Sequence, residues 1–232
     1  MTGTTLWCVV PAAGRGVRAG GDLPKQYQLL AGRSLIEHTL ERLAVHPRIG
    51  GLLVTLAADD RHWPGLHDVR GKPVLTAIGG AQRSESVLAG LDALPERVGS
   101  EEFVLVHDAA RPCVRPNDIG RLIEQGTQGD GGLLGAPLRD TLKHADGDGR
   151  VERTESRESR WRAFTPQMFR RGPLAAALRE ANRQGVAVSD EAMAMELAGF
   201  SPLLVEGAED NIKVTTAADF ALAEFLLART SS

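Results

Sequence analysis

The sequence predicts an α/β fold, built as a mostly parallel twisted sheet with helices on both faces. Short apolar runs alternate with segments of helical periodicity along most of the chain, and the first run, Leu6–Val10, leads into a glycine-rich loop. Such βαβ alternation is typical of parallel sheets covered on both sides by helices. A chain of 232 residues is long enough for one such core, so we expect residues 1–232 to form a single domain.

Each apolar run is short enough for a buried strand. The predicted strands are Leu6–Val10, Gly51–Leu56, Pro73–Ile78, Phe103–Val106, Leu133–Ala136 and Leu203–Glu206. Apolar residues at helical intervals, and the capping-box spacing of Ser34 and Glu37, predict the helices. These run through Leu35–Leu43, Val87–Leu94, Asp118–Gln125, Pro173–Gln184 and Glu191–Ala198, with a last helix after Thr216 as its N-cap.

Composition excludes several classes of protein. The net charge is -3 and aromatic residues make up 4%, whereas a nucleic-acid binder usually carries a basic face and stacking aromatics. Cys8 and Cys113 offer neither metal-ligand spacing nor a disulfide framework. No signal peptide or membrane-length apolar run is present. We therefore expect a cytoplasmic protein with neither a membrane nor a nucleic acid as partner.

The pattern changes at Pro137. Residues 138–163 contain seven cationic side chains, and their apolar content is too low for an independent core. One interpretation is a solvated or disordered loop, and the other is a hairpin arm ordered by packing on a partner chain. A structureless loop of this length is uncommon inside a compact domain, which favours a projecting arm over residues 137–163.

The loop after the first strand carries the strongest chemical signal. Gly14 and Gly16 allow the backbone to approach a ligand closely, and successive amides of such a loop bind anions. Arg18 and Lys25 add charges that suit a triphosphate. The loop matches neither the G-x-G-x-x-G fingerprint nor a Walker A motif. The alternative is a flexible turn with two surface cations.

The segment His107-Asp-Ala-Ala-Arg-Pro112 directly follows the strand Phe103–Val106. Ligands of open α/β sheets bind beyond the carboxyl ends of the strands. A carboxylate placed there can hold Mg²⁺ while phosphates supply other ligands, and Asp108 is our candidate. Arg111 would form an ion pair or contact a phosphate. Alternatively, Asp108 only caps the turn.

Two further segments are weaker signals. Gly79 and Gly80 precede a helix, so Gly80 and Ser86 could contact a base or ribose, although helix capping by Ser84 would explain the serines equally well. Lys213, just before the last helix, could reach a phosphate or could be a surface lysine. The histidines form no zinc-ligand pair, and no nucleophile elbow occurs.

Together these segments resemble the 2-C-methyl-D-erythritol 4-phosphate cytidylyltransferase family of the non-mevalonate isoprenoid pathway, from Pro11 to about Arg229. The resemblance depends on the combination of motifs rather than on any single one. The motifs are Pro-Ala-Ala-Gly-x-Gly-x-Arg18 with Pro24-Lys-Gln26, Ser86–Leu91, Val106–Pro112, Arg139-Asp-Thr141, Thr165-Pro-Gln167, Asp190-Glu-Ala192 and Asp210–Thr215.

The resemblance implies a Rossmann-like sheet, an arm that interlocks two subunits of a homodimer, the substrate CTP and Mg²⁺. It gives Arg18 and Lys25 a role in stabilising the transition state, and Arg157 of the partner subunit together with Lys213 a role in positioning the acceptor phosphate. Asp108 would serve the metal and the acceptor. The other implied contacts are Pro11, Ala12, Ala13, Gly14, Gly16, Gly80 and Ser86 for the nucleotide, and Arg111, Thr141 and Ser189 for the acceptor.

The expected reaction is cytidylyl transfer from CTP to 2-C-methyl-D-erythritol 4-phosphate, with release of pyrophosphate. A phosphate monoester is itself a nucleophile, so positioning and charge stabilisation are expected to do most of the work. Two alternatives remain open, namely a cytidylyltransferase for another polyol phosphate such as ribitol 5-phosphate, and a nucleotide-binding relative without turnover. Ala81 and Ser189 depart from the family's usual residues, as does Ala19 beside Gly20-Gly21 in the loop.

Overall fold

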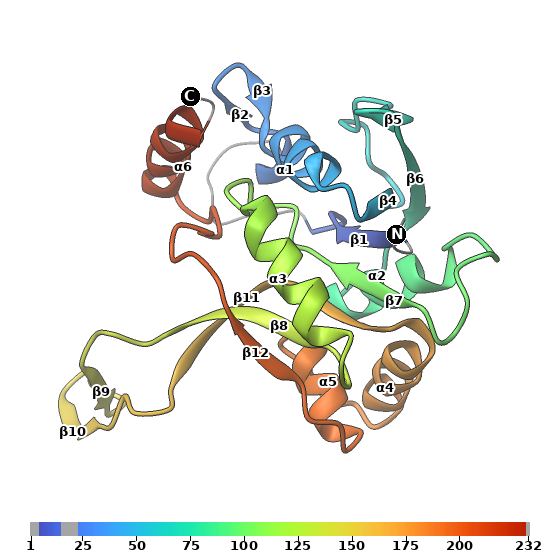
Figure 1. The fold of residues 1–232 in the computed structure, drawn as a ribbon. Helices are drawn as coiled ribbons and strands as arrows, with labels where there is room; N and C mark the ends of the chain where they lie inside the picture. Colours follow the sequence, from blue (N-terminus) through green and yellow to red (C-terminus); the bar gives the residue numbers. More distant parts are fainter. Residues whose placement is uncertain (1–4, 15–22, 231–232) are drawn as a thin grey trace.

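The computed structural model describes residues 5–14 and 23–230. Its centre is a twisted eight-stranded sheet with the order β12-β8-β11-β7-β1-β4-β6-β5 (Figure 1). The sheet strands are β1 (Leu6–Pro11), β4 (Ile49–Leu56), β5 (Asp68–Val69), β6 (Lys72–Ile78), β7 (Phe103–Val106), β8 (Gly132–Pro137), β11 (Trp161–Arg170) and β12 (Leu203–Glu206). All six predicted strands are therefore present, with ends that shift by one or two residues.

The sheet is mostly parallel, as predicted. β6, β4, β1 and β7 pair in parallel, as do β8 and β12, so the carboxyl ends of these strands lie along one edge. The strand β11 was not predicted, and residues 161–163 of the predicted arm belong to it. It runs antiparallel between β7 and β8, and its Gln167 pairs with Val106. Because Val106 ends β7, the residues of β11 before Gln167 extend past that carboxyl end.

Helices cover both faces of the sheet, which confirms the predicted Rossmann-like α/β class (Figure 1). On one face, α1 and α3 pack on a core that includes Cys8 and Leu105. On the other face, α2, α4 and α5 pack on a core that includes Val9 and Val106. The helices are α1 (Leu35–Val45), α2 (Arg83–Asp92), α3 (Pro116–Gly126), α4 (Arg171–Arg183), α5 (Glu191–Leu197) and α6 (Ala217–Thr230).

Local sequence signals fix several helix ends. The Ser34 side chain accepts a hydrogen bond from the amide of Glu37, and the Glu37 carboxylate accepts one from the amide of Ser34, so the predicted capping box is present. Thr216 directly precedes α6 as predicted. Its amide and hydroxyl both donate to the carboxylate of Asp219.

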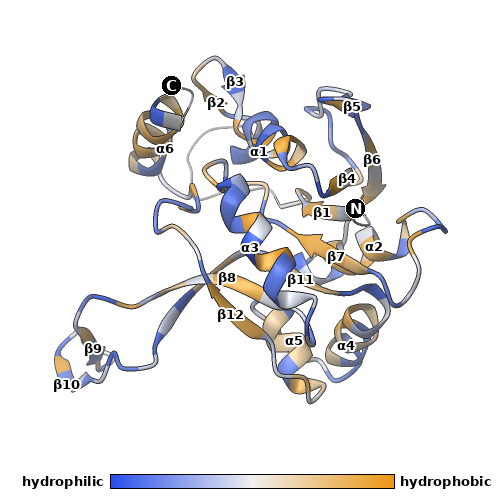
Figure 2. Cartoon of the chain, in the orientation of Figure 1, coloured by the Kyte–Doolittle hydropathy of each residue, from blue (hydrophilic) through white to orange (hydrophobic). Residues whose placement is uncertain are grey.

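The segment between β8 and β11 projects from the body of the molecule (Figure 1). Its tip is a two-stranded antiparallel hairpin of β9 (Leu142–Ala145) and β10 (Val151–Glu155). Most of its side chains are exposed, and Figure 2 shows hydrophilic stretches along its two connections. No residue of β9 or β10 is buried, so this segment contributes little to the core.

Candidate active site

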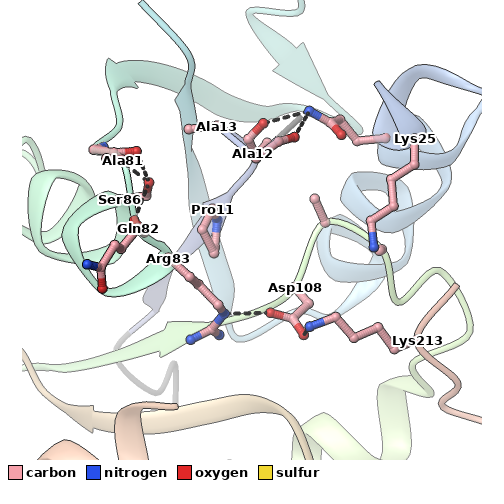
Figure 3. Close-up of a pocket in the computed structure, with 15 residues that line it drawn as sticks. Pro11, Ala12, Ala13, Lys25, Ala81, Gln82, Arg83, Ser86, Asp108 and Lys213 are labelled. Carbon is pink, nitrogen blue, oxygen red and sulfur yellow. Dashed lines mark hydrogen bonds and ion pairs between the residues drawn. The ribbon is translucent and has the colours of Figure 1, made fainter. Parts of the chain in front are cut away.

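A pocket opens where β1, β6 and β7 end, at the carboxyl edge of the sheet (Figure 3). It has one wall from the loop after β1, one from the start of α2, and a floor from the turn after β7. Its lining residues are Pro11, Ala12, Ala13, Gly14, Lys25, Gln26, Gly80, Ala81, Gln82, Arg83, Ser86, Asp108, Ala109, Ala110 and Lys213. The structure thus brings together most of the residues that the sequence assigned to nucleotide, metal and phosphate.

Gln26 fixes the loop after β1. It lies in a short 3-10 helix, Lys25–Tyr27, and its side chain is only 4% exposed. The Nε2 of Gln26 donates to the carbonyl oxygens of Ala12, at 2.7 Å, and of Gly14, at 3.0 Å. With both carbonyls tied to Gln26, the backbone of residues 12–14 is held against the pocket.

The opposite wall needs the two glycines that precede α2. A Cβ on Gly79 would lie 2.7 Å from the Cβ of Ala13, and one on Gly80 would lie 2.4 Å from the Cβ of Glu85. The Ser86 hydroxyl donates toward the carbonyls of Gly80 and Gln82 and accepts from the amide of Gly80. Ser84 is not the N-cap of α2, since Gln82 takes that position.

The carboxylate of Asp108 lies at the centre of a cluster of cations (Figure 3). Its Oδ1 is 2.9 Å from Arg83 Nε, and its Oδ2 is 2.9 Å from Lys213 Nζ. A third cation, Arg111, approaches Oδ2 at 3.5 Å. Burial alone would raise the pKa of Asp108, but the positive charges of Arg83, Lys213 and Arg111 outweigh it and hold the pKa well below its usual range. Asp108 is therefore ionised at neutral pH, and its low pKa makes it a weak base.

Neutral His107 and Thr165 hold the main chain of Asp108. The Asp108 amide donates to the Thr165 hydroxyl at 3.0 Å. Because the carbonyl of Arg111 can only accept, His107 Nε2 donates to it, which leaves Nδ1 to accept from the Thr165 hydroxyl. Burial lowers the pKa of His107 to about 4, so this tautomer persists at neutral pH. Thr165 reaches Asp108 because β11 extends past the end of β7.

Lys25, one of the two predicted catalytic lysines, reaches the segment that carries the other, Lys213. Lys25 Nζ donates to the carbonyl of Val214 at 3.1 Å, next to Lys213, while Lys213 itself pairs with Asp108. Both residues line the pocket, and 42% of the Lys213 side chain is exposed.

Other predicted residues lie elsewhere. Arg111 is buried behind the pocket, where its NH1 donates to the carbonyl of Asn211 at 2.7 Å and its guanidinium stacks 5.2 Å from the ring of Phe164. Ser189 is in the loop before α5, and its hydroxyl faces Asp190 and Met193.

Two predicted residues belong to the arm. Thr141 is exposed just before β9. Arg157 is exposed between β10 and β11, and its guanidinium donates to the carbonyl of Arg139 within the arm. Neither residue lines the pocket. The predicted Gly16 and Arg18 lie outside the described residues.

Sequence reasoning missed Arg83 and Glu191. Arg83 follows the glycine pair, and Glu191 lies in the Asp190-Glu-Ala192 motif, but neither position suggested a role. In the structure their side chains form a bidentate ion pair beside Asp108. The positions are 108 residues apart, and no local pattern connects them. No group of three or more metal-ligating side chains occurs in residues 5–14 and 23–230.

Comparison with known proteins agrees with this geometry. Residues 6–229 match the family described as 2-C-methyl-D-erythritol 4-phosphate cytidylyltransferase. The protein of that name from Stenotrophomonas maltophilia (strain K279a) is 58% identical over 225 residues, which cover 97% of each chain. The chain belongs to this family. The match confirms the resemblance and, with it, membership of the nucleotidyltransferases.

Solved structures of the family share the fold. A crystal structure of 4-diphosphocytidyl-2C-methyl-D-erythritol synthase superposes with a TM-score of 0.83 at 31% identity, and covers 97% of this chain and 99% of its own. The Francisella tularensis 2-C-methyl-D-erythritol 4-phosphate cytidylyltransferase superposes with a TM-score of 0.81 at 32% identity, over 96% and 100% of the two chains. Within the described part of our chain, no helix is both long and apolar enough to span a membrane.

Proposed function

We propose that this chain transfers a cytidylyl group from CTP to 2-C-methyl-D-erythritol 4-phosphate and releases pyrophosphate, as a step of isoprenoid precursor biosynthesis. The observation that carries the proposal is the pocket at the carboxyl edge of the sheet, where the backbone of residues 11–14 faces Lys25 and Lys213. Family membership supplies the identities of the nucleotide and the acceptor.

In the proposed reaction, an oxygen of the acceptor's phosphate attacks the α-phosphorus of CTP. A new P–O bond forms as the bond between the α-phosphorus and the bridging oxygen breaks, and pyrophosphate leaves with the electron pair. The nucleophile is already an anion, so no protein group has to remove a proton. Both ring nitrogens of His107 are engaged, by the Arg111 carbonyl and the Thr165 hydroxyl, and the low pKa of Asp108 makes it a weak base; both facts agree with chemistry that needs no general base.

The cations of this chain would supply most of the catalysis. Two anionic substrates repel each other, and Lys25 and Lys213 line the space that both would share. Lys25 would stabilise the charge that grows on the α-phosphate, together with Arg18, which lies outside the described residues. Lys213 would leave Asp108 for the acceptor's phosphate. Preorganised charges of this kind are usually the largest catalytic contribution.

The chemistry of the pocket suits Mg²⁺. Asp108 is the one carboxylate among the described residues that line it, and it is ionised at neutral pH. Mg²⁺ typically takes one or two carboxylates and completes its shell with phosphate oxygens and water. Asp108 would hold the ion, which would neutralise charge on the phosphates of CTP when bound.

We also propose a homodimer in which the arm completes the site of the partner subunit. Among the described residues, none from the arm lines the pocket of its own chain. The family motif around Thr141 nevertheless lies in the arm. Arg157 of the partner subunit and Thr141 of the partner subunit would add contacts to the acceptor. If so, the arm should be essential both for the dimer and for acceptor binding.

The cytoplasmic location predicted from the sequence is likewise a proposal. It is supported by the two cysteines, Cys8 and Cys113, which are buried free thiols. Proteins in reducing compartments keep such thiols unpaired.

The test is a pyrophosphate-release assay that combines CTP, ATP, GTP or UTP with 2-C-methyl-D-erythritol 4-phosphate or ribitol 5-phosphate, in the presence of Mg²⁺. Release with CTP and the erythritol phosphate alone is the expected result. Release with ribitol 5-phosphate instead would contradict the proposed acceptor. Binding of CTP without release for any acceptor would identify a relative that has lost turnover.

A further inference from the structure

A partly buried ion pair connects the start of α2, which lines the pocket, to the start of α5. Arg83 is the first residue of α2, and Glu191 is the first residue of α5. The guanidinium donates to the Glu191 carboxylate twice, at 2.6 and 3.1 Å. The side chain of Glu191 is 1% exposed. A bidentate pair of this kind fixes the plane of the guanidinium as well as its position.

The orientation of the Arg83 guanidinium plane matters because its third nitrogen, Nε, reaches Asp108 in the pocket. Its Nε donates to Oδ1 of Asp108 at 2.9 Å, so the Arg83 guanidinium joins Glu191 to Asp108 (Figure 3 shows the Arg83–Asp108 contact). The coulombic attraction of Glu191 and Asp108 raises the pKa of Arg83 despite its burial, so its charge is permanent.

Glu191 is itself held in place from the sheet. The Gln167 side chain, on β11, donates to the carboxylate of Asp190 at 2.9 Å and accepts from the amide of Ala192 at 2.8 Å. Both neighbours of Glu191 are therefore anchored to a central strand. The start of α5 offers a rigid support, and the contact from Arg83 to Asp108 inherits that rigidity.

We propose that Arg83 and Glu191 are a positioning pair. The pair holds Oδ1 of Asp108 in place while Oδ2 loses Lys213 to the acceptor's phosphate and binds Mg²⁺ instead. This inference rests on the proposed function. When the acceptor's phosphate draws Lys213 away from Asp108, Arg83 remains as the short contact to the carboxylate, since Arg111 lies farther away at 3.5 Å. The pair thus acts on catalysis through Asp108, without a reacting atom of its own.

A purely structural ion pair would behave differently. Replacing both partners of a buried pair with apolar residues of similar size is often neutral or stabilising, whereas removing one partner leaves an unpaired buried charge. The double variant Arg83→Met/Glu191→Met therefore separates the two roles, because it removes the positioning contact without leaving either partner of the pair unpaired, while Asp108 keeps Lys213 and Arg111 as charged partners.

The experiment compares the wild type, Arg83→Met/Glu191→Met and a matched control in steady-state assays with CTP and the erythritol phosphate. The control is Arg179→Met/Asp92→Met, which removes an ion pair between α4 and α2 that is exposed and away from the pocket. We expect kcat of the Arg83/Glu191 variant to fall about 10- to 100-fold, as is typical when the partners of a functional ligand are lost. The KM for CTP and the melting temperature should change little, and the control should retain wild-type kinetics.

A kcat within about two-fold of the wild type in the folded double variant would overturn the inference. If the double variant fails to fold, Glu191→Gln provides the test. Glutamine has the shape of glutamate and still offers Arg83 one acceptor, but it removes the charge and so weakens the pair. An unchanged kcat in Glu191→Gln would then overturn the inference, and a lowered kcat at unchanged KM for CTP would support it. Failure of the proposed function is distinguishable, since the wild type itself would then release no pyrophosphate.

Discussion

The variant Gln26→Met tests whether one buried amide organises the loop that faces CTP. Methionine has nearly the same length and volume but cannot donate a hydrogen bond. The change removes the bonds to the carbonyls of Ala12 and Gly14 and leaves both acceptors without that donor. A buried hydrogen bond contributes about 1 kcal/mol, so the free energy of unfolding should fall by about 2 kcal/mol. For a chain of this size, that loss lowers the melting temperature by about 4–8 °C.

The same variant should also bind CTP more weakly, because residues 12–14 form one wall of the pocket. We expect a raised KM for CTP and an unchanged KM for the acceptor, measured by pyrophosphate release. Gln128→Met is the matched control, since the exposed Gln128 amide donates a bond of 3.3 Å to the carbonyl of Glu124 and does not line the pocket. A Gln26→Met protein that melts like the wild type, or that melts lower but keeps its KM for CTP, would refute this reasoning.

Four further outcomes are expected. Lys25→Ala should lower turnover on the order of 10²–10³-fold at unchanged stability, and near-normal turnover would remove Lys25 from the catalytic residues. Chelation of divalent ions should abolish pyrophosphate release, and added Mg²⁺ should restore it; activity that survives chelation would contradict the metal proposal. Gly90→Ala should cost about 1–3 kcal/mol in denaturant unfolding, because the new Cβ would lie 2.5 Å from Val9, whereas the control Gly129→Ala meets no atom within 4 Å. Burial first, and then the charges of Lys72 and Arg48, lower the pKa of His46, so the unfolded chain takes up the proton first as pH falls. As the pH falls below about 6.5, the free energy of unfolding of the wild type should thus decrease more steeply than that of His46→Asn. If urea unfolding gave the same pH dependence for both proteins, the pKa of His46 would not be shifted.

Much of this fold follows from patterns that are local in the sequence. An apolar run such as Phe103–Val106 predicts a buried strand, and the polar residues that follow it must lie at the carboxyl edge of the sheet. The same reasoning applies to the loop of residues 11–14 after the first strand, so the order of residues alone is enough to expect this loop and Asp108 at one site. It works because parallel strands present their ends at a common edge, whatever the details of their pairing.

Residues 161–170 show where local reasoning stops. The stretch contains Pro166 and two arginines, which mask a strand pattern, and its antiparallel position between β7 and β8 depends on pairing with segments far away in the chain. The same limit applies to Arg83 and Glu191, whose contact exists only after α2 and α5 have packed on one face of the sheet. Long-range partners of this kind have no signature at fixed spacing.

The electrostatics of the pocket differ in sign from those of the whole chain. The protein carries a net charge of -3, yet among the described residues four cations meet two carboxylates around the pocket, namely Lys25, Arg83, Arg111 and Lys213 with Asp108 and Glu191. Glu191 pairs with Arg83 from behind, and Asp108 pairs with Lys213. Lys213 can leave Asp108, because its stem is flexible and its charge is compact. Arg83 and Arg111 are held rigidly by contrast. This arrangement suits a site in which the two arginines keep Asp108 fixed while Lys213 moves to the phosphate of a substrate.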